Sequence, residues 1–204
     1  MLGAGEFCSI LNVQLHIQDP ANPDAPFLHE KILELCQGAT SGGGMFAFAS
    51  SDGVKLLLKD EVFKKFAGAH KFELIVGIDE ITNSKALQAL KETSDELPKL
   101  DVKVFSHNRV QSIFHPKLCW FRHKVKSYLL TGSGNLTVRG LRGNWEGFGV
   151  GELGGDSANA LEQQWADWRQ FHVNRLKTVD DPEVVARAAT GSIPSIRPDS
   201  HWLN

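Results

Sequence analysis

The chain has 204 residues, of which 42% are hydrophobic and 23% charged, and its formal net charge is −2. This composition is ordinary for a soluble globular protein, and the length suits one α/β domain with a sizeable core rather than a disordered chain. The three cysteines, Cys8, Cys36 and Cys119, are scattered and odd in number, so they predict no disulfide framework and favour a reducing, cytoplasmic location. No secretory signal and no membrane-spanning apolar stretch is recognisable.

Strands and helices are expected to alternate through the first half of the chain. The glycine-rich segment 41–44 is expected to be a flexible turn, and Thr82 or Asn83 is expected to cap a helix. The expected strands are 11–17, 45–49, 72–78 and 102–105, and the expected helices are 27–37, 54–58, 61–66 and 83–94. The alternation predicts an α/β fold with a mixed, mostly parallel β-sheet and helices on both of its faces.

Two further helices are expected after the central segment. The first runs from Asp156 or Ser157 to about Lys177, with Trp165 and Trp168 interpreted as core residues. The second covers 183–189, started by Pro182 in its first turn. Residues 191–204 contain two prolines and few apolar residues, so they are interpreted as an exposed tail or truncated linker. Residues 1–190 are therefore expected to form one domain.

Three short polar motifs follow one another within residues 114–150. They are His115-x-Lys117, then Gly132-Ser133-Gly134-Asn135, then Asn144-x-Glu146. The flanking residues are apolar, β-branched or aromatic, which predicts two or three strands. Because residues i and i+2 share one face of a strand, each pair of polar side chains is expected to point the same way. Adjacent strands would then gather six polar side chains around one point.

These side chains suit phosphodiester chemistry without a metal ion. The imidazole of His115 is the candidate nucleophile, which would form a covalent phospho-histidine. Lys117, Ser133 and Asn135 would stabilise the charge that develops on the phosphoryl oxygens. Glu146 would accept a hydrogen bond from the imidazole and so fix its tautomer. We expect these five to be catalytic and no metal or other cofactor to take part.

The ordered motifs resemble the phospholipase D superfamily, whose signature is H-x-K followed by G-S or G-x-N. More narrowly, they resemble the BfiI-like metal-independent restriction endonucleases and the nuclease Nuc. The resemblance implies a phospholipase D-like catalytic domain and an endodeoxyribonuclease activity that belongs to a restriction or defence system. One departure is Arg122, which stands where the superfamily usually has an Asp after the Lys, so the later Glu146 would supply the carboxylate. His29-x-Lys31 also matches H-x-K but has no asparagine-bearing turn after it.

Positive charge is concentrated around these motifs. Between Val102 and Trp145 there are eight Lys or Arg and no Asp or Glu: Lys103, Arg109, Lys117, Arg122, Lys124, Lys126, Arg139 and Arg142. A basic segment that coincides with a phosphodiesterase motif favours a polyanionic substrate, although lysines also protect exposed strand edges. We expect Arg109, Arg139, Arg142 and Asn144 to bind substrate.

The expected partners are DNA, with RNA as a second candidate, and another copy of the chain. The superfamily chemistry uses two H-x-K motifs, and this chain has one credible copy, so the resemblance implies a homodimer with the active site at its two-fold interface. Sequence specificity would need a recognition domain or a partner chain. No membrane association is expected. Two alternatives remain open: a phospholipid hydrolase or transferase, and a non-catalytic nucleic-acid-binding module. A zinc site at His115, Cys119 and His123 is disfavoured by its spacing.

Overall fold

An eight-stranded β-sheet forms the centre of the computed structural model, which describes residues 12–79 and 81–190. The order across the sheet is β1-β7-β6-β5-β2-β3-β4-β8. The bounds are β1 Asn12–Gln18, β2 Ser41–Phe46, β3 Lys71–Gly77, β4 Leu100–Phe105, β5 Lys117–Arg122, β6 Ser127–Gly132, β7 Glu146–Leu153 and β8 Leu176–Lys177.

The strand directions confirm a mixed sheet but show that "mostly parallel" was wrong. Only β2 with β3 and β3 with β4 pair in parallel among the described strands, and every other neighbouring pair is antiparallel. The reason lies in the connections. The link between β5 and β6, residues 123–126, is too short to hold a crossover helix, so β6 must reverse direction. The longer link between β6 and β7, residues 133–145, contains only the five-residue turn η1, and β7 returns antiparallel beside β6. The parallel pairs occur where α2, α3 and α4 provide crossovers.

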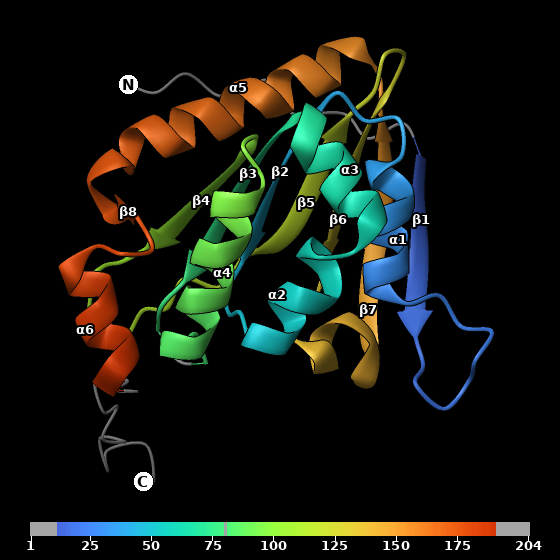
Figure 1. Cartoon of the computed structure of the whole chain (residues 1–204). Helices are drawn as coiled ribbons and strands as arrows, with labels where there is room; N and C mark the ends of the chain where they lie inside the picture. The colour runs from blue at the N-terminus through green and yellow to red at the C-terminus, as the bar shows by residue number, and fades with distance from the viewer. Residues whose placement is uncertain (1–11, 80, 191–204) are drawn as a thin grey trace, which may run out of the picture.

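Helices cover both faces of the sheet, as expected (Figure 1). One face carries α1 Leu28–Cys36, α2 Ser51–Leu58, α3 Glu61–Ala69 and α4 Ser84–Glu96, with α6 Pro182–Thr190 beside α4. The long helix α5, Gly155–Phe171, crosses the other face, and its Trp165 is buried against Trp120 of β5. A π-helical turn, η1 Arg139–Gly143, precedes β7, and a 3-10 turn, η2 Val173–Arg175, follows α5.

The buried carboxylate of Glu73 fastens α5 to the sheet. It accepts a hydrogen bond from Trp165 Nε1 at 2.6 Å and forms an ion pair with Arg169, both from α5. Burial alone would raise the pKa of Glu73, but hydrogen bonds from Lys71 and Trp165, together with the charge of Arg169, hold it below its usual range. The helix is therefore held in one position, which matters for the cavity described below.

Two local expectations were wrong, and both for packing reasons. Residues 41–44 form most of β2 rather than a turn, because Gly43 leaves room for large aromatic neighbours: a Cβ there would lie 2.6 Å from Trp120 Nε1 and 2.7 Å from Trp165 Cζ2. The helix expected to reach Lys177 ends at Phe171, since the chain then turns so that β8 can pair with β4. The expected tail at 191–204 lies outside the described residues.

Candidate active site

The three motifs meet at one end of the sheet, where β2, β3, β4 and β6 end and β5 and β7 begin. Antiparallel register brings this about, because Leu118 pairs with Thr131 and Gly132 pairs with Phe148. Hairpin pairing of β5, β6 and β7 therefore places residues 115, 133 and 146 at a common edge, although 31 positions separate the first from the last in sequence. In Figure 1 this is the lower end of the sheet, beside η1 and α2.

His115 and Lys117 are in direct contact. Lys117 Nζ lies 3.0 Å from Nε2 and 3.2 Å from Nδ1 of His115, and it donates to the backbone carbonyl of His115 at 3.3 Å. His115 precedes β5 rather than lying on it, so the loop, and not strand alternation, sets its direction. Its exposed ring packs edge-on to Phe48 at 5.9 Å between centroids. Burial lowers the pKa of Lys117, while the charge of Glu146 opposes that shift.

Glu146 binds the other two motifs together. One carboxylate oxygen accepts a hydrogen bond from Ser133 Oγ, and the other accepts from Asn144 Nδ2 at 3.1 Å. The backbone reinforces the pair, since Ser133 N donates to Gly147 O at 3.0 Å and Gly147 N donates to Ser133 Oγ at 3.2 Å. We expected Glu146 to accept from the imidazole of His115; the contacts in the structure instead make it the group that orients Ser133 and Asn144.

Asn135 is fixed by its carbonyl oxygen, which accepts a hydrogen bond from Phe48 N at 3.2 Å. That contact leaves the amide nitrogen as the end of the side chain that can donate to a ligand. The turn can form because Gly140 allows η1 to approach closely: a Cβ on Gly140 would lie 2.5 Å from both Asn135 N and Asn135 O. Gly140, between the second and third motifs, is therefore required for the turn that carries Asn135.

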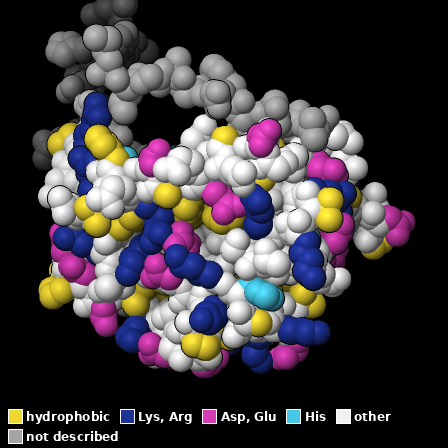
Figure 2. Space-filling model, turned by 90° about the horizontal axis from the view of Figure 1, so that it is seen from above, with side chains coloured by type: hydrophobic (Ala, Val, Ile, Leu, Met, Phe, Trp, Pro, Cys, Tyr) yellow, Lys and Arg dark blue, Asp and Glu magenta, His cyan; other side chains and the backbone are white. Residues whose placement is uncertain are grey.

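The basic segment 102–145 is divided between the two ends of the sheet. Arg109, Arg139 and Arg142 are exposed on segments at the site end, and Arg142 lies over the ring of Phe27 at 5.5 Å. At the far end, where β5 turns into β6, the cations are neutralised by carboxylates: Arg122 by Glu162 at 2.9 Å and Lys126 by Glu152 at 2.8 Å. Figure 2 looks down on that far end and shows Lys and Arg side chains intermixed with Asp and Glu.

Three residues that sequence reasoning missed hold the site's loops. The wholly buried Gln18 donates from Nε2 to the carbonyl of Asn144 at 2.8 Å and accepts from Leu28 N at 2.9 Å, so it joins β1, α1 and the Asn144 segment. The buried Asp79 accepts from Phe114 N at 2.8 Å, next to His115, and Arg187 of α6 donates to Asp79 at 3.0 Å. A polar residue at or just after the end of an apolar strand is the sequence signal that Gln18 and Asp79 carry, whereas Arg187, within α6, carries none.

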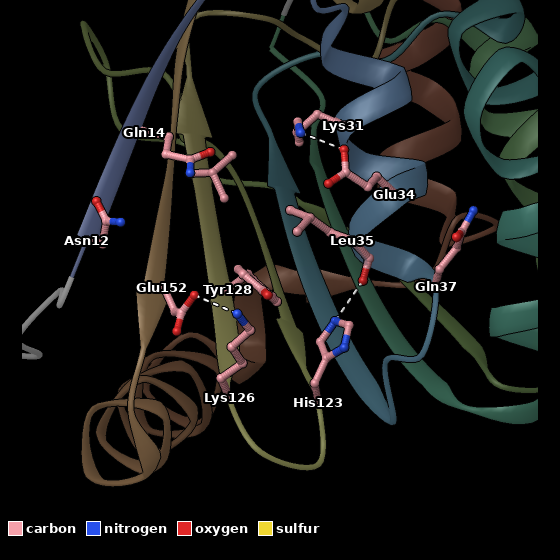
Figure 3. A pocket seen from close by; sticks show the side chains of 11 residues that line it. Asn12, Gln14, Lys31, Glu34, Leu35, Gln37, His123, Lys126, Tyr128 and Glu152 are labelled. Atoms are coloured by element: carbon pink, nitrogen blue, oxygen red, sulfur yellow. Dashed lines mark hydrogen bonds and ion pairs between the residues drawn. The ribbon is translucent and has the colours of Figure 1, made fainter.

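Two cavities of similar size lie on opposite faces of the sheet. The first, about 440 Å³, opens at His115 on the α5 face and is named the catalytic cavity because it adjoins the candidate nucleophile. Its lining includes Arg109, Phe114, His115, Trp168, His172 and Arg175. The hairpin cavity, about 430 Å³, lies on the α1 face near the β5–β6 turn (Figure 3). Its lining includes Lys31, Glu34, His123, Lys126, Tyr128 and Glu152.

The zinc arrangement considered from the sequence does not form. His115 and His123 lie at opposite ends of β5, and His123 Nε2 is 3.0 Å from the carbonyl oxygen of Leu35. Burial raises the pKa of the Cys119 thiol well above its usual range. Across residues 12–79 and 81–190 there is no group of three or more His, Cys, Asp or Glu side chains placed to hold a metal ion. None of the helices in the same ranges is long and apolar enough to cross a membrane.

Comparison with known proteins supports the fold assignment. No protein-family model and no curated protein sequence matches the chain. Among solved structures, it is similar to NucT from Helicobacter pylori, with 14% identity and a TM-score of 0.56 over 82% of this chain and 98% of that one. It is also similar to Nuc from Salmonella typhimurium, a phospholipase D family member, with 19% identity and a TM-score of 0.52 over 81% and 96% of the two chains.

A third similar structure belongs to a longer protein. Phosphatidylserine synthase from Haemophilus influenzae matches 81% of this chain at 16% identity and a TM-score of 0.52, and the match spans 39% of the synthase. Identities this low show a shared fold and no more. The shared fold is the phospholipase D-like fold that the motif resemblance implied.

Proposed function

We propose that this chain, which has the phospholipase D fold, is a metal-independent phosphodiesterase that cleaves DNA. The observation that carries the proposal is the convergence of three sequence motifs at one end of the sheet, with Lys117 Nζ 3.0 Å from His115 Nε2. A nucleophile beside a cation, with a hydroxyl and an amide close by, is a constellation that phosphoryl transfer requires. The similar structures support the proposal through their fold.

The reaction has two balanced steps. In the first, a nitrogen of neutral His115 attacks phosphorus, a P–N bond forms, and the P–O bond to the leaving nucleoside breaks as a general acid protonates that oxygen. In the second, water attacks the phospho-histidine, the same acid–base group takes the proton from water, and the P–N bond breaks. The product is a terminal phosphate and His115 returns unchanged.

The remaining site residues stabilise charge and hold one another in place. Lys117 Nζ and the amide of Asn135 would donate to the non-bridging oxygens, where charge develops in each step. Ser133 also faces this region, and its hydroxyl direction is fixed by Glu146. Asn144 is held by the same carboxylate and by Gln18, so it positions the loop that carries Arg139 and Arg142. Those arginines would contact the phosphates of the DNA backbone.

The general acid is best supplied by His115 of a second copy. This chain has one H-x-K motif followed by the other two, and the acid must approach phosphorus from the side opposite the nucleophile. A two-fold dimer that brings both His115 side chains to one site meets that need. Two imidazoles so close do not both charge easily, so one remains a neutral nucleophile while the other is a protonated acid.

A mixed dimer tests the shared site. One wild-type chain is paired with one His115→Ala chain through different affinity tags, and the purified heterodimer is assayed for steady-state cleavage. A shared site predicts almost no turnover, whereas two independent sites would leave about half of the wild-type rate. A fully active monomer would also contradict the shared site.

We further propose that the enzyme acts in restriction or defence in the cytoplasm, with specificity supplied by another domain or chain.

A phospholipid substrate is the second candidate. It is favoured by a row of apolar side chains on β1, since Val13, Leu15 and Ile17 are 58%, 77% and 59% exposed beside the glycines of β7. One of the similar structures is a phosphatidylserine synthase. Release of a headgroup from phosphatidylglycerol vesicles, lost in His115→Ala, would favour this candidate.

The DNA-cleaving activity is tested by incubating plasmid and single-stranded DNA with the protein in excess EDTA. We expect cleavage that persists in EDTA and is absent from a folded His115→Ala variant. An absolute requirement for a divalent cation, or undiminished cleavage by His115→Ala, would overturn the proposed chemistry.

A further inference from the structure

The catalytic cavity has a composition that its neighbour across the sheet lacks. None of the described residues that line it is Asp or Glu, while it contains Arg109, Arg175 and three histidines. Its inner wall is aromatic and is formed by Trp168, Phe105 and Phe114. A cationic rim around an aromatic wall complements a ligand that joins an anion to a flat ring.

We propose that this cavity is a subsite for one unpaired nucleotide next to the scissile phosphodiester, with its base against Trp168 and its phosphate near Arg109 and Arg175. The inference rests on the proposed DNA-cleaving function and specifies its substrate as single-stranded or locally opened DNA. A volume of about 440 Å³ lies within the range of small-ligand sites.

The aromatic wall is rigid before any ligand arrives. The half-buried Trp168 packs against Phe105, with 5.5 Å between ring centroids and 29° between planes, and against Phe114 at 6.1 Å. On the same helix, Trp165 and Arg169 are fixed to the buried Glu73. An indole held in this way can stack on a base without first losing side-chain entropy, and stacking tolerates any base because each has a π-face.

The polar wall carries charge in a defined position. Arg175 Nη1 lies 2.8 Å from His172 Nδ1, so the guanidinium donates to a neutral imidazole. Burial and the charge of Arg175 both lower the pKa of His172, in agreement with that geometry. The His172 ring lies beside Trp168, with 4.6 Å between centroids and 54° between planes, and Arg175 remains the cation available to a phosphate.

The nucleotide must be unpaired because its base has to leave a duplex before it can enter the cavity. His115 lines both the cavity and the reaction site, so a base inside would belong to the nucleotide adjoining the attacked phosphorus. A base in a duplex is stacked between its neighbours and hydrogen-bonded to its partner. Entry into a cavity therefore requires that it leave the helix, at an unstacking cost of a few kcal/mol, which is absent for a single strand.

Binding measured without cleavage tests the subsite. All proteins carry His115→Ala, and the affinity for a fluorescent single-stranded decamer is measured by anisotropy in EDTA. A matched decamer lacks one central base. We expect Trp168→Leu to weaken the intact decamer about tenfold, within the range measured for base–aromatic stacking, and the abasic one by less than about twofold. Val125→Ala, which changes a 90% exposed apolar residue in the β5–β6 turn, should affect neither.

A second variant guards against misfolding of Trp168→Leu. Arg175 is exposed, so Arg175→Gln should fold normally and should weaken both decamers equally, because both retain the phosphate. Equal losses for intact and abasic DNA in Trp168→Leu, with no loss in Arg175→Gln, would overturn the subsite. Loss of binding to phosphatidylglycerol vesicles in Trp168→Leu, with unchanged decamer affinity, would overturn it in favour of a lipid.

The subsite and the nuclease activity fail in different ways. If wild-type protein does not cut DNA but Trp168→Leu still weakens binding of the intact decamer more than binding of the abasic one, the subsite is supported and the proposed function is contradicted. If wild-type protein cuts DNA in EDTA while the two decamers respond alike, the function stands and the subsite falls.

Discussion

The hairpin and catalytic cavities have nearly the same volume, about 430 and 440 Å³, but opposite electrostatic character. In the hairpin cavity the charged side chains neutralise one another: Lys31 pairs with Glu34, and Lys126 pairs with Glu152 at 2.8 Å (Figure 3). In the catalytic cavity the described lining has cations and no carboxylate. Paired surface charges contribute little net attraction for an anion, whereas unpaired cations in a concave site attract one strongly.

The basic segment of the sequence, residues 102–145, therefore does not form one continuous basic surface. Its members alternate between the two ends of the antiparallel strands, and each end has its own role. At the far end, Arg122 joins β5 to α5 through Glu162, and Lys126 joins the β5–β6 turn to β7 through Glu152. At the site end, Arg109, Arg139 and Arg142 are exposed around the candidate catalytic residues. Substitutions matched across the two ends should therefore have unequal effects.

The largest difference is expected between two histidines. His115→Ala should lower the cleavage rate by at least about 10³-fold, because losses of this size or more follow removal of a nucleophile. His123→Ala, in the hairpin cavity, removes an interaction with the carbonyl of Leu35 and a ring contact with Tyr128, both far from the site, and should leave the rate within about twofold of wild type. Steady-state cleavage in EDTA, with folding checked by circular dichroism, measures both. Similar losses in the two variants would show that the site is misplaced.

The second difference concerns groups that stabilise charge. Lys117→Ala and Asn135→Ala should each lower kcat on the order of 10²-fold with little change in DNA affinity, since both donate most strongly to the transition state. Glu146→Gln should slow cleavage less, because a glutamine can still accept from Ser133. Glu152→Gln, the matched change at the far end, should have no effect. If DNA affinity falls as much as kcat in Lys117→Ala, that lysine acts only in binding.

The third difference should appear as salt dependence. Arg139→Ala or Arg142→Ala should reduce the slope of log K against log salt by about 0.9 for each DNA phosphate that the variant no longer binds. Lys126→Ala should leave the slope unchanged, because its cation is already paired with Glu152. Binding is measured by anisotropy with folded His115→Ala protein over a range of salt concentrations. Equal slopes for all three variants would indicate that the site-end arginines do not contact DNA.

The smallest expected effect is a shift in pH dependence. Burial lowers the pKa of Lys117, so the charged form that stabilises phosphoryl oxygens is lost at lower pH than for an ordinary lysine. The alkaline limb of the kcat profile should therefore lie below the usual titration range of lysine. Lys117→Arg should move that limb to higher pH, even if its rate is lower. An alkaline limb that stays in place would assign it to another group.

Periodicity and capping residues predicted most elements of the fold, because local sequence determines them. Asn83 caps α4 as expected, and the strong apolar run at 72–78 corresponds to β3. The strand directions were less accessible, since a short connection implies antiparallel pairing only once the strand ends are known. The glycines of β2 were misread as a turn because their role depends on Trp120 and Trp165, which are distant in sequence.

For the site, the motif spacing predicted which residues come together but not how they contact one another. Strand alternation was the wrong reason for the approach of His115 to Lys117, since His115 lies in a loop held by Asp79 through Phe114 N. Likewise, Glu146 bonds Ser133 and Asn144, a choice fixed by the β6–β7 register. Such contacts depend on backbone positions to within an ångström, which no pattern of residue types specifies.

A covalent bond between His115 and phosphorus distinguishes the proposed chemistry from direct hydrolysis, and mass spectrometry of trapped enzyme detects it. Protein mixed with a short oligonucleotide in EDTA is quenched in alkaline denaturant, where phospho-histidine survives, and is then digested. We predict a nucleotide adduct on the peptide that contains His115, formed during turnover and absent from His115→Ala. Full cleavage with no adduct at any time point, or an adduct only on another residue, would contradict the account.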